Sequence, residues 1–216
     1  MIRGDSSDYE LLEKWTKDFD CQGYKSCEIG VREGLGSKII MDNVINNYIH
    51  VGVDPYGNLK YQHYDKGPAY TADYTDQMRD TMLKDFLPYR NEGRFTLCNM
   101  TDTDFMNESK HSGSKFAFVH FDGPHMSKDV MTEAIWFANR CAPHTRFVFD
   151  DHKKYEMSII AHALTPVPYT HLTLPTIYHV YFPVDAVLLI KNKSINIYAY
   201  SNYRQATATI TDIQQT

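Results

Sequence analysis

Apolar positions along the chain follow two spacings, one typical of amphipathic helices and the other of buried strands. Helical spacing, with apolar residues three or four positions apart, marks residues 8–18, 37–46, 75–89, 127–142 and 156–164. Short and nearly continuous apolar runs mark residues 24–31, 48–57, 94–100, 115–123, 146–151, 184–192 and 194–203. Strands and helices therefore alternate along the chain, which predicts an α/β fold.

The order of these segments predicts a doubly wound, mostly parallel sheet with helices on both faces, a Rossmann-like arrangement. The last two runs are joined by turn-like residues 191–194, so we expect a C-terminal antiparallel strand pair there. The polar residues 58–74 are interpreted as a loop that folds over a site, and residues 101–114 as a polar break. Pro143 is expected to end the helix that precedes it.

A chain of 216 residues fits a single domain, with a core over about residues 20–200. Residues 1–19 are expected to contribute an N-terminal helix, and the polar residues 201–216 to fray. Residues 169–176 resemble the translated sequence of a sequencing adapter and carry no predicted functional residue; the alternative is a natural loop with proline breaks at Pro168 and Pro175.

Charge and cysteine content narrow the class of partner. The net charge of −5 argues against binding along a nucleic-acid backbone, which requires a basic surface. No apolar run reaches the ~20 residues that span a membrane, and the polar start of the chain is unlike a signal peptide. Four scattered cysteines, with Cys27 and Cys98 inside apolar runs, fit a reduced, cytoplasmic protein. A small-molecule partner is the expectation, and a homo-oligomer is compatible with this composition.

Ligands of open parallel sheets bind at the carboxyl ends of the strands. The first run leads into a glycine-bearing loop, residues 28–37, and then into a helix whose N-terminus offers free N–H groups. Asp54 follows the second run, where a carboxylate can accept hydrogen bonds from two ribose hydroxyls. Loop and carboxylate together predict a nucleoside-type cofactor. The alternative is an ordinary strand-to-helix turn, with Asp54 as a turn-forming residue before a proline.

Acidic residues also follow two later strands, as Asp122 and the pair Asp150–Asp151. Clustered carboxylates repel one another, and Mg²⁺ or another divalent cation would relieve that repulsion through oxygen ligands. His125 lies three residues after Asp122 and is a natural base near neutral pH, with His152 as a second candidate. The alternative is that these residues cap helices or lie in surface turns.

Taken together, these segments resemble the class I S-adenosylmethionine-dependent methyltransferases. CEIGVREGLGS, residues 27–37, is similar to their first motif, and HVGVDPYG, residues 50–57, is similar to their second. VHFDGPH and RFVFDDH, at residues 119–125 and 146–152, most resemble a metal-dependent O-methyltransferase branch. That branch includes macrocin-type sugar methyltransferases and cephalosporin-hydroxylase-like proteins.

The resemblance implies methyl transfer from S-adenosylmethionine to a hydroxyl oxygen of a small molecule or a sugar. In that branch an Asp-x-x-His sequence supplies a metal ligand and the base, and an acidic pair on the next strand supplies two more ligands. The implied roles are cofactor binding by Glu28, Gly30, Arg32, Gly34, Ser37, Asp54, Asn99, Thr101 and Asp122, Mg²⁺ binding by Asp122, Asp150 and Asp151, and general base catalysis by His125.

Two other functional interpretations of the same residues stay open. A nicotinamide-dependent oxidoreductase would use a similar sheet, but Gly30, Gly34 and Gly36 do not have the G-x-G-x-x-G spacing of its loop. A non-catalytic binding domain would keep the fold and the cofactor loop without turnover, since fold alone does not prove function.

Overall fold

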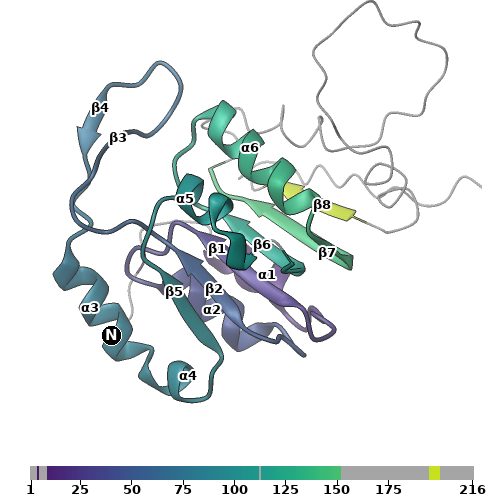
Figure 1. Cartoon of the computed structure of the whole chain (residues 1–216). Coiled ribbons are helices and arrows are strands. Elements are labelled where there is room, and N and C mark those ends of the chain that lie inside the picture. The colour runs from purple at the N-terminus through teal and green to yellow at the C-terminus, as the bar shows by residue number, and fades with distance from the viewer. Residues whose placement is uncertain (1–3, 5–8, 112, 152–194, 200–216) are drawn as a thin grey trace, which may run out of the picture.

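The computed structural model describes residues 4, 9–111, 113–151 and 195–199. Within them the central sheet has six strands, all neighbours running parallel (Figure 1). In spatial order the strands are β5 (Phe95–Cys98), β2 (His50–Val53), β1 (Lys25–Ile29), β6 (Phe116–Phe121), β7 (Cys141–Phe149) and β8 (Ile195–Ala199). The predicted α/β fold with a mostly parallel, doubly wound sheet is confirmed.

Helices cover both faces of this sheet, which is why its central strands are almost continuously apolar. On one face, α1 (Tyr9–Thr16) and α2 (Leu35–Asn43) pack through Leu12 and Ile40 against Phe118 of β6. On the other face lie α5 (Asp102–Asn107) and α6 (Ser127–Ala138) (Figure 1). Every residue of β2 and of β6 is buried.

Aromatic rings fill the layer between the sheet and α6. Phe137 is fully buried, and its ring centroid lies 5.0 Å from that of Phe116, 5.7 Å from that of Phe121 and 6.3 Å from that of Phe105. These rings come from α6, β6 and α5, so one side chain joins three elements of the core.

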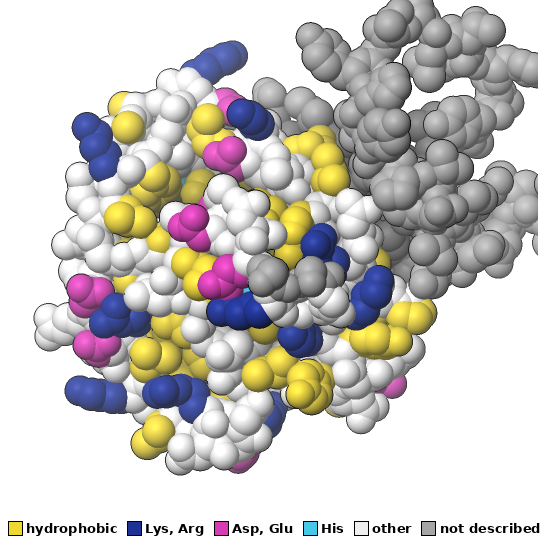
Figure 2. All heavy atoms as spheres, viewed as in Figure 1, with side chains coloured by type: hydrophobic (Ala, Val, Ile, Leu, Met, Phe, Trp, Pro, Cys, Tyr) yellow, Lys and Arg dark blue, Asp and Glu magenta, His cyan; other side chains and the backbone are white. Residues whose placement is uncertain are grey.

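The outer surface is different in kind, since Figure 2 shows lysine, arginine and acidic side chains interspersed with apolar ones on the visible face.

Two segments that the sequence assigns to loops contain regular structure. Residues 58–74 include an antiparallel hairpin of β3 (Lys60–Gln62) and β4 (Ala69–Thr71), which projects beyond the central sheet (Figure 1). The residues of β4 are all exposed, so the hairpin has no alternation of buried and exposed positions that a sequence could reveal. Residues 101–114 contain α5 and a short 3₁₀ helix, η1 (Ser109–His111).

Helix boundaries also differ from the prediction at two places. The helix expected over residues 75–89 is divided into α3 (Asp76–Asp85) and α4 (Leu87–Asn91), with Pro88 in the first turn of α4. Backbone N–H groups in the first turn of a helix have no intrahelical acceptor, so a proline at this position costs no hydrogen bond. The other helix, α6, ends at Ala138 and not at Pro143, which lies within β7.

Part of the predicted C-terminal region lies outside the described residues. This holds for the predicted helix at 156–164, the adapter-like residues 169–176, the strand at 184–192, the tail 201–216 and His152. The run at 194–203 contains β8, which pairs parallel with β7. The antiparallel pair that the structure describes is therefore the hairpin β3–β4, while the partner strand predicted at 184–192 stays untested.

Two further expectations can be compared with the described residues. The four cysteines all lie within them and form no disulfide. None of the helices in the described part of the chain combines the length and the apolar character needed to cross a membrane.

Replacing Phe137 with alanine should lower the free energy of unfolding by about 3–5 kcal/mol, because a buried ring shared by three elements leaves a cavity. Urea denaturation followed by circular dichroism measures this loss. Leu87→Ala is the control, since Leu87 is 50% exposed, and its change should stay within about 0.5 kcal/mol. Equal losses in the two variants would contradict the assigned packing.

Candidate cofactor-binding and active site

The register of the three central strands brings the first predicted site residues to one edge of the sheet. Ile29 of β1 pairs with Val53 of β2 on one side and with Phe121 of β6 on the other. Gly30, Asp54 and Asp122 each come directly after one of these strand ends. The sequence predicts their convergence because the carboxyl ends of parallel strands share an edge, and the register bears this out.

The carboxylate of Asp54 holds the loop that follows β1. Its Oδ2 accepts hydrogen bonds from the backbone N–H of Val31, at 3.0 Å, and of Arg32, at 2.8 Å. Asp54 is 1% exposed, and its other oxygen, Oδ1, is buried and accepts no hydrogen bond within the described part of the chain. A buried carboxylate oxygen without a donor is costly, so this position suits a ligand that brings hydroxyl donors.

Burial governs the protonation of Asp54. It raises the pKa of this carboxyl group from 3.8 to about 6, although the hydrogen bonds from Arg32 and Val31 act in the opposite direction. The sign follows because a desolvated carboxylate loses more hydration energy than the backbone N–H donors, chiefly those of Arg32 and Val31, return. A donor placed on Oδ1 would stabilise the ionised form and lower the pKa again.

The loop between β1 and α2 uses left-handed backbone at alternate positions. Gly30 has φ of 85°, and a Cβ there would lie 2.2 Å from the backbone oxygen of Asp122. Gly34, the residue before α2, has φ of 92°, and a Cβ there would lie 2.8 Å from Cγ of Met82. Arg32 adopts φ of 49° between them, with its guanidinium 5.5 Å from the ring centroid of Tyr74. Both glycines are therefore required by conformation and by space.

A buried chain of polar side chains runs beneath this loop. Glu28 accepts a hydrogen bond from the hydroxyl of Ser37 on one oxygen, and its other oxygen lies 2.9 Å from Nδ1 of His120. His50 Nε2 lies 3.0 Å from Ser37 Oγ, and His50 Nδ1 lies 2.8 Å from Oγ of Ser26. All five residues are buried.

The hydrogen bonds in this series of side chains all run in the same direction. Ser37 donates to Glu28, so its oxygen accepts from Nε2–H of His50, and Nδ1 of His50 then accepts from the hydroxyl of Ser26. Burial, aided by the charge of His120, lowers the pKa of His50 to about 3, which keeps this imidazole neutral. These hydrogen bonds orient Glu28 and Ser37, two of the predicted cofactor-binding residues.

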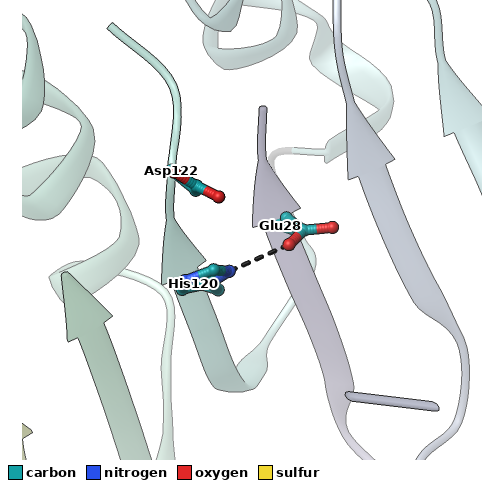
Figure 3. A group of neighbouring side chains, drawn as sticks. All are labelled: Glu28, His120 and Asp122. Atoms are coloured by element: carbon teal, nitrogen blue, oxygen red, sulfur yellow. Dashed lines mark hydrogen bonds and ion pairs between the residues drawn. The ribbon is translucent and has the colours of Figure 1, made fainter. Parts of the chain in front are cut away.

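Glu28, His120 and Asp122 form a group whose ligand atoms lie within 4.8 Å of one another (Figure 3). The three side chains come from the neighbouring strands β1 and β6, with Asp122 just past the end of β6. A nitrogen and two carboxylates suit a transition metal better than Mg²⁺, which prefers an all-oxygen shell. Both oxygens of Glu28 are already engaged by Ser37 and His120, so this group is satisfied without an ion.

The predicted magnesium ligands do not form such a group. Asp150 is buried, and its backbone N–H donates to the carbonyl of Phe121 at 3.0 Å, which places it next to Asp122 along the sheet edge. Among the residues that the structure describes, however, Asp122, Asp150 and Asp151 do not bring three ligand atoms within 4.8 Å of one another. The role of these three residues in metal binding stays a prediction.

Two predicted cofactor-binding residues make structural contacts of their own. Thr101 caps α5, since its hydroxyl oxygen accepts from the backbone N–H of Asp104 at 3.1 Å. With its amide oriented to satisfy both groups, Asn99 donates to the backbone oxygen of Asp54 and accepts from Arg79, each at 3.2 Å. Asn99 therefore supports the Asp54 turn, and Thr101 is the N-cap of α5, while cofactor binding by either residue stays a prediction.

His125, the predicted base, is buried and lies two residues before α6. Its Nδ1 lies 3.2 Å from Nε2 of His63, a residue that the sequence places only in a polar loop. No local signal marks His63, because its contact with His125 spans 62 positions of the chain. The pairing of Glu28 with His120 spans 92 positions, so no local signal marks it either.

Replacing Asp54 with asparagine should change how stability depends on pH. The unfolded chain ionises Asp54 near 3.8 and the folded chain near 6, so the stability this group contributes is full below pH 3.8 and is lost as pH rises through 6. Between pH 4 and pH 8 the wild-type protein should lose about 2–3 kcal/mol relative to Asp54→Asn. Urea denaturation across this range measures the difference, and a difference that does not vary with pH would contradict the assigned burial.

Alanine at position 30 should destabilise the protein more than alanine at another left-handed glycine. Gly93→Ala is the matched control, since Gly93 has φ of 69° and nothing lies within 4 Å of the added Cβ. Both variants carry the backbone strain, but Gly30→Ala should lose a further ~1–3 kcal/mol through the clash with Asp122. Thermal or urea denaturation compares the stabilities of the two variants, and equal losses would contradict the close approach of Gly30 to Asp122.

Comparison with known families agrees with this geometry. A family model described as a methyltransferase domain matches residues 27–152, more than half of the chain. The matched region begins in β1 and contains the loop, Asp54, Asp122 and the whole of β7. A search of the curated proteins returned no match. On the evidence of its fold and of this match, the chain belongs to the methyltransferase-domain family.

Proposed function

We propose that this protein transfers a methyl group from S-adenosylmethionine to a hydroxyl oxygen of a small molecule or a sugar. The observation that carries the proposal is Asp54, whose Oδ1 is buried and accepts no hydrogen bond within the described residues, beside a loop fixed by Oδ2. Ribose hydroxyls are donors, and two of them on one carboxylate is the arrangement used for nucleoside cofactors on this type of sheet.

The loop supports the same placement of the cofactor. Gly30 allows the backbones of β1 and β6 to approach closely at the edge where the cofactor would lie. The N-terminus of α2 follows the loop directly, and Gly34 leaves its first N–H groups without a side-chain cap. Such groups suit the carboxylate of the methionine moiety, because a helix N-terminus attracts anions. Glu28 and Asp122 would supply negative charge on the side where the positive sulfonium binds.

The chemistry needs one proton acceptor and a close approach. The acceptor's hydroxyl gives its proton to His125, its oxygen attacks the methyl carbon, and the carbon–sulfur bond breaks to leave S-adenosylhomocysteine. Most of the rate gain would come from holding the oxygen and the methyl carbon in line and in contact. His125 suits the role of base because it lies three residues after Asp122 and just before α6, with its backbone N–H bonded to the carbonyl of His63.

A divalent cation such as Mg²⁺, held by Asp122, Asp150 and Asp151, is the part of the proposal that rests on the sequence. When bound, such an ion would lower the pKa of the acceptor's hydroxyl group. The described residues do not gather these three carboxylates into one site, so the steps above are assigned to the protein's own residues. Removal of metal is accordingly a separate arm of the test.

Substitution of His125 tests the function. Wild-type protein is incubated with S-adenosylmethionine, with Mg²⁺ or with EDTA, and with a panel of sugars and phenols, and S-adenosylhomocysteine formation is measured. His125→Ala should lower kcat by roughly 10²- to 10⁴-fold, the usual contribution of a general base, with unchanged affinity for the cofactor. His144→Gln is the control, since His144 lies on β7 and stacks on Phe19, with ring centroids 5.0 Å apart.

The outcomes separate the parts of the proposal. Activity that EDTA abolishes and Mg²⁺ restores would support the metal, and full activity in EDTA would remove it. If His125→Ala and Asp122→Ala both kept the wild-type rate in EDTA, the proposed mechanism would be wrong. Cofactor binding without product across the whole panel would favour a non-catalytic binding domain.

A further inference from the structure

The proposed base is joined to the projecting hairpin by both its ring and its backbone. His125 Nδ1 lies 3.2 Å from His63 Nε2, and the backbone N–H of His125 donates to the carbonyl of His63. The next hairpin residue, Tyr64, forms a parallel β-bridge with His125. The two imidazoles therefore meet because their backbones are paired.

One residue further along, the hairpin is fastened again. The carboxylate of Asp65 accepts from the backbone N–H of Ser127 at 3.1 Å and also from its hydroxyl. Ser127 is the first residue of α6, so three consecutive residues of the hairpin are anchored on the segment that begins this helix. Anchoring by backbone fixes a side chain more firmly than a contact between two long side chains would.

Aromatic rings surround the imidazole of His63 on its hairpin side. The ring centroid of Tyr61 lies 6.0 Å away, and those of Tyr64 and Tyr70 each lie 6.2 Å away, all in edge-on arrangements. The ring of His125 meets the same imidazole edge-on at 4.8 Å. His63 is thus packed between the tyrosines of the hairpin and His125, which restricts its rotation.

We propose that His63 is a positioning residue that fixes the tautomer of His125. The proposal rests on the proposed function, in which His125 takes the acceptor's proton on Nε2. For that nitrogen to accept a proton, the neutral ring must carry its own hydrogen on Nδ1, and that hydrogen then points at Nε2 of His63. The tautomer of a histidine is set by the hydrogen bond made by its other nitrogen.

The same contact changes in strength during the reaction. The O–H bond of the acceptor breaks, its proton moves to Nε2 of His125, and its oxygen forms the bond to the methyl carbon as the bond to sulfur breaks. His125 is then an imidazolium, and its Nδ1–H donates to neutral His63 in a charge-assisted hydrogen bond, which is about twice as strong as a neutral one. The proton leaves to water after the methylated product and S-adenosylhomocysteine have departed.

Nuclear magnetic resonance of ¹⁵N-labelled histidine tests the positioning role without relying on activity. Full-length wild-type protein at about pH 8 should show His125 as the Nδ1–H tautomer. His63→Gln, whose side-chain oxygen can accept the same hydrogen bond, should keep that tautomer. His63→Phe keeps an aromatic ring in the hairpin but offers no acceptor, so the Nε2–H form of His125 should increase. An Nε2–H tautomer in the wild type, or no change in His63→Phe, would overturn the proposal.

Kinetics of the three proteins provide the second readout. His63→Phe should lower kcat by roughly 10- to 100-fold, the usual effect of removing the partner that orients a functional histidine, while KM for S-adenosylmethionine stays the same. His63→Gln should recover most of the loss, and Gln62→Ala, on the same hairpin, should behave as the wild type. A wild-type kcat in His63→Phe would refute the positioning role. An inactive wild type would instead refute the proposed function and leave the tautomer measurement valid.

Discussion

The site depends on one buried carboxylate at the end of β2. Asp54 is removed from water, yet it accepts two backbone hydrogen bonds from the loop that follows β1. These bonds fix the position of Val31 and Arg32, and with them the entry into α2. The energy lost on desolvation is only partly offset, as the raised pKa of Asp54 shows. A ligand that donates a hydrogen bond to the remaining oxygen would compensate the rest of this desolvation energy. The cost of burying Asp54 and the binding of a cofactor are therefore linked.

Beneath the same loop, the hydrogen-bonded side chains from Ser26 through His50 and Ser37 to Glu28 satisfy one another's buried polar groups. Buried polar groups are stable only when every donor meets an acceptor, and a series of hydrogen bonds with a single donor direction achieves that from Ser26 to Glu28. A neutral His50 is essential to this direction, and burial provides it by lowering the pKa of the ring. Glu28 and Ser37 are therefore held by buried hydrogen bonds, whereas His125 is held by the hairpin that carries His63.

The sequence predicts the parts of this structure that depend on local pattern. The strands β1, β2 and β6 are visible as apolar runs because helices cover both faces of the sheet. Asp54 and Asp122 are identifiable because each directly follows such a run. The hairpin β3–β4 is not predictable in this way, since its strands are three residues long and largely exposed. The partners His63 and His120 are recognisable only once distant strands are placed side by side.

The predicted magnesium ligands follow neighbouring strands but do not form one group of ligand atoms in the described part of the chain. Asp150 and Asp151 follow β7, and β7 is the neighbour of β6, which Asp122 follows. Neighbouring strands bring these residues to one edge, but the direction of each side chain depends on local backbone, and Asp151 adopts a left-handed φ of 48°. Glu28 and His120 are the residues whose ligand atoms form a group with that of Asp122, all within 4.8 Å of one another. Strand order predicts which residues approach one another, and only the structure gives their orientation.

Calorimetric titration of wild-type protein and Asp54→Asn with S-adenosylhomocysteine, with NADH as the competing ligand, tests the central claim most directly. We expect one bound S-adenosylhomocysteine per chain, negligible binding of NADH, and an affinity about 5- to 100-fold lower in Asp54→Asn, the range expected when hydrogen bonds to a charged group are weakened. Binding of NADH in preference, or equal affinity of S-adenosylhomocysteine for both proteins, would contradict the assignment of Asp54 as the cofactor's ribose ligand.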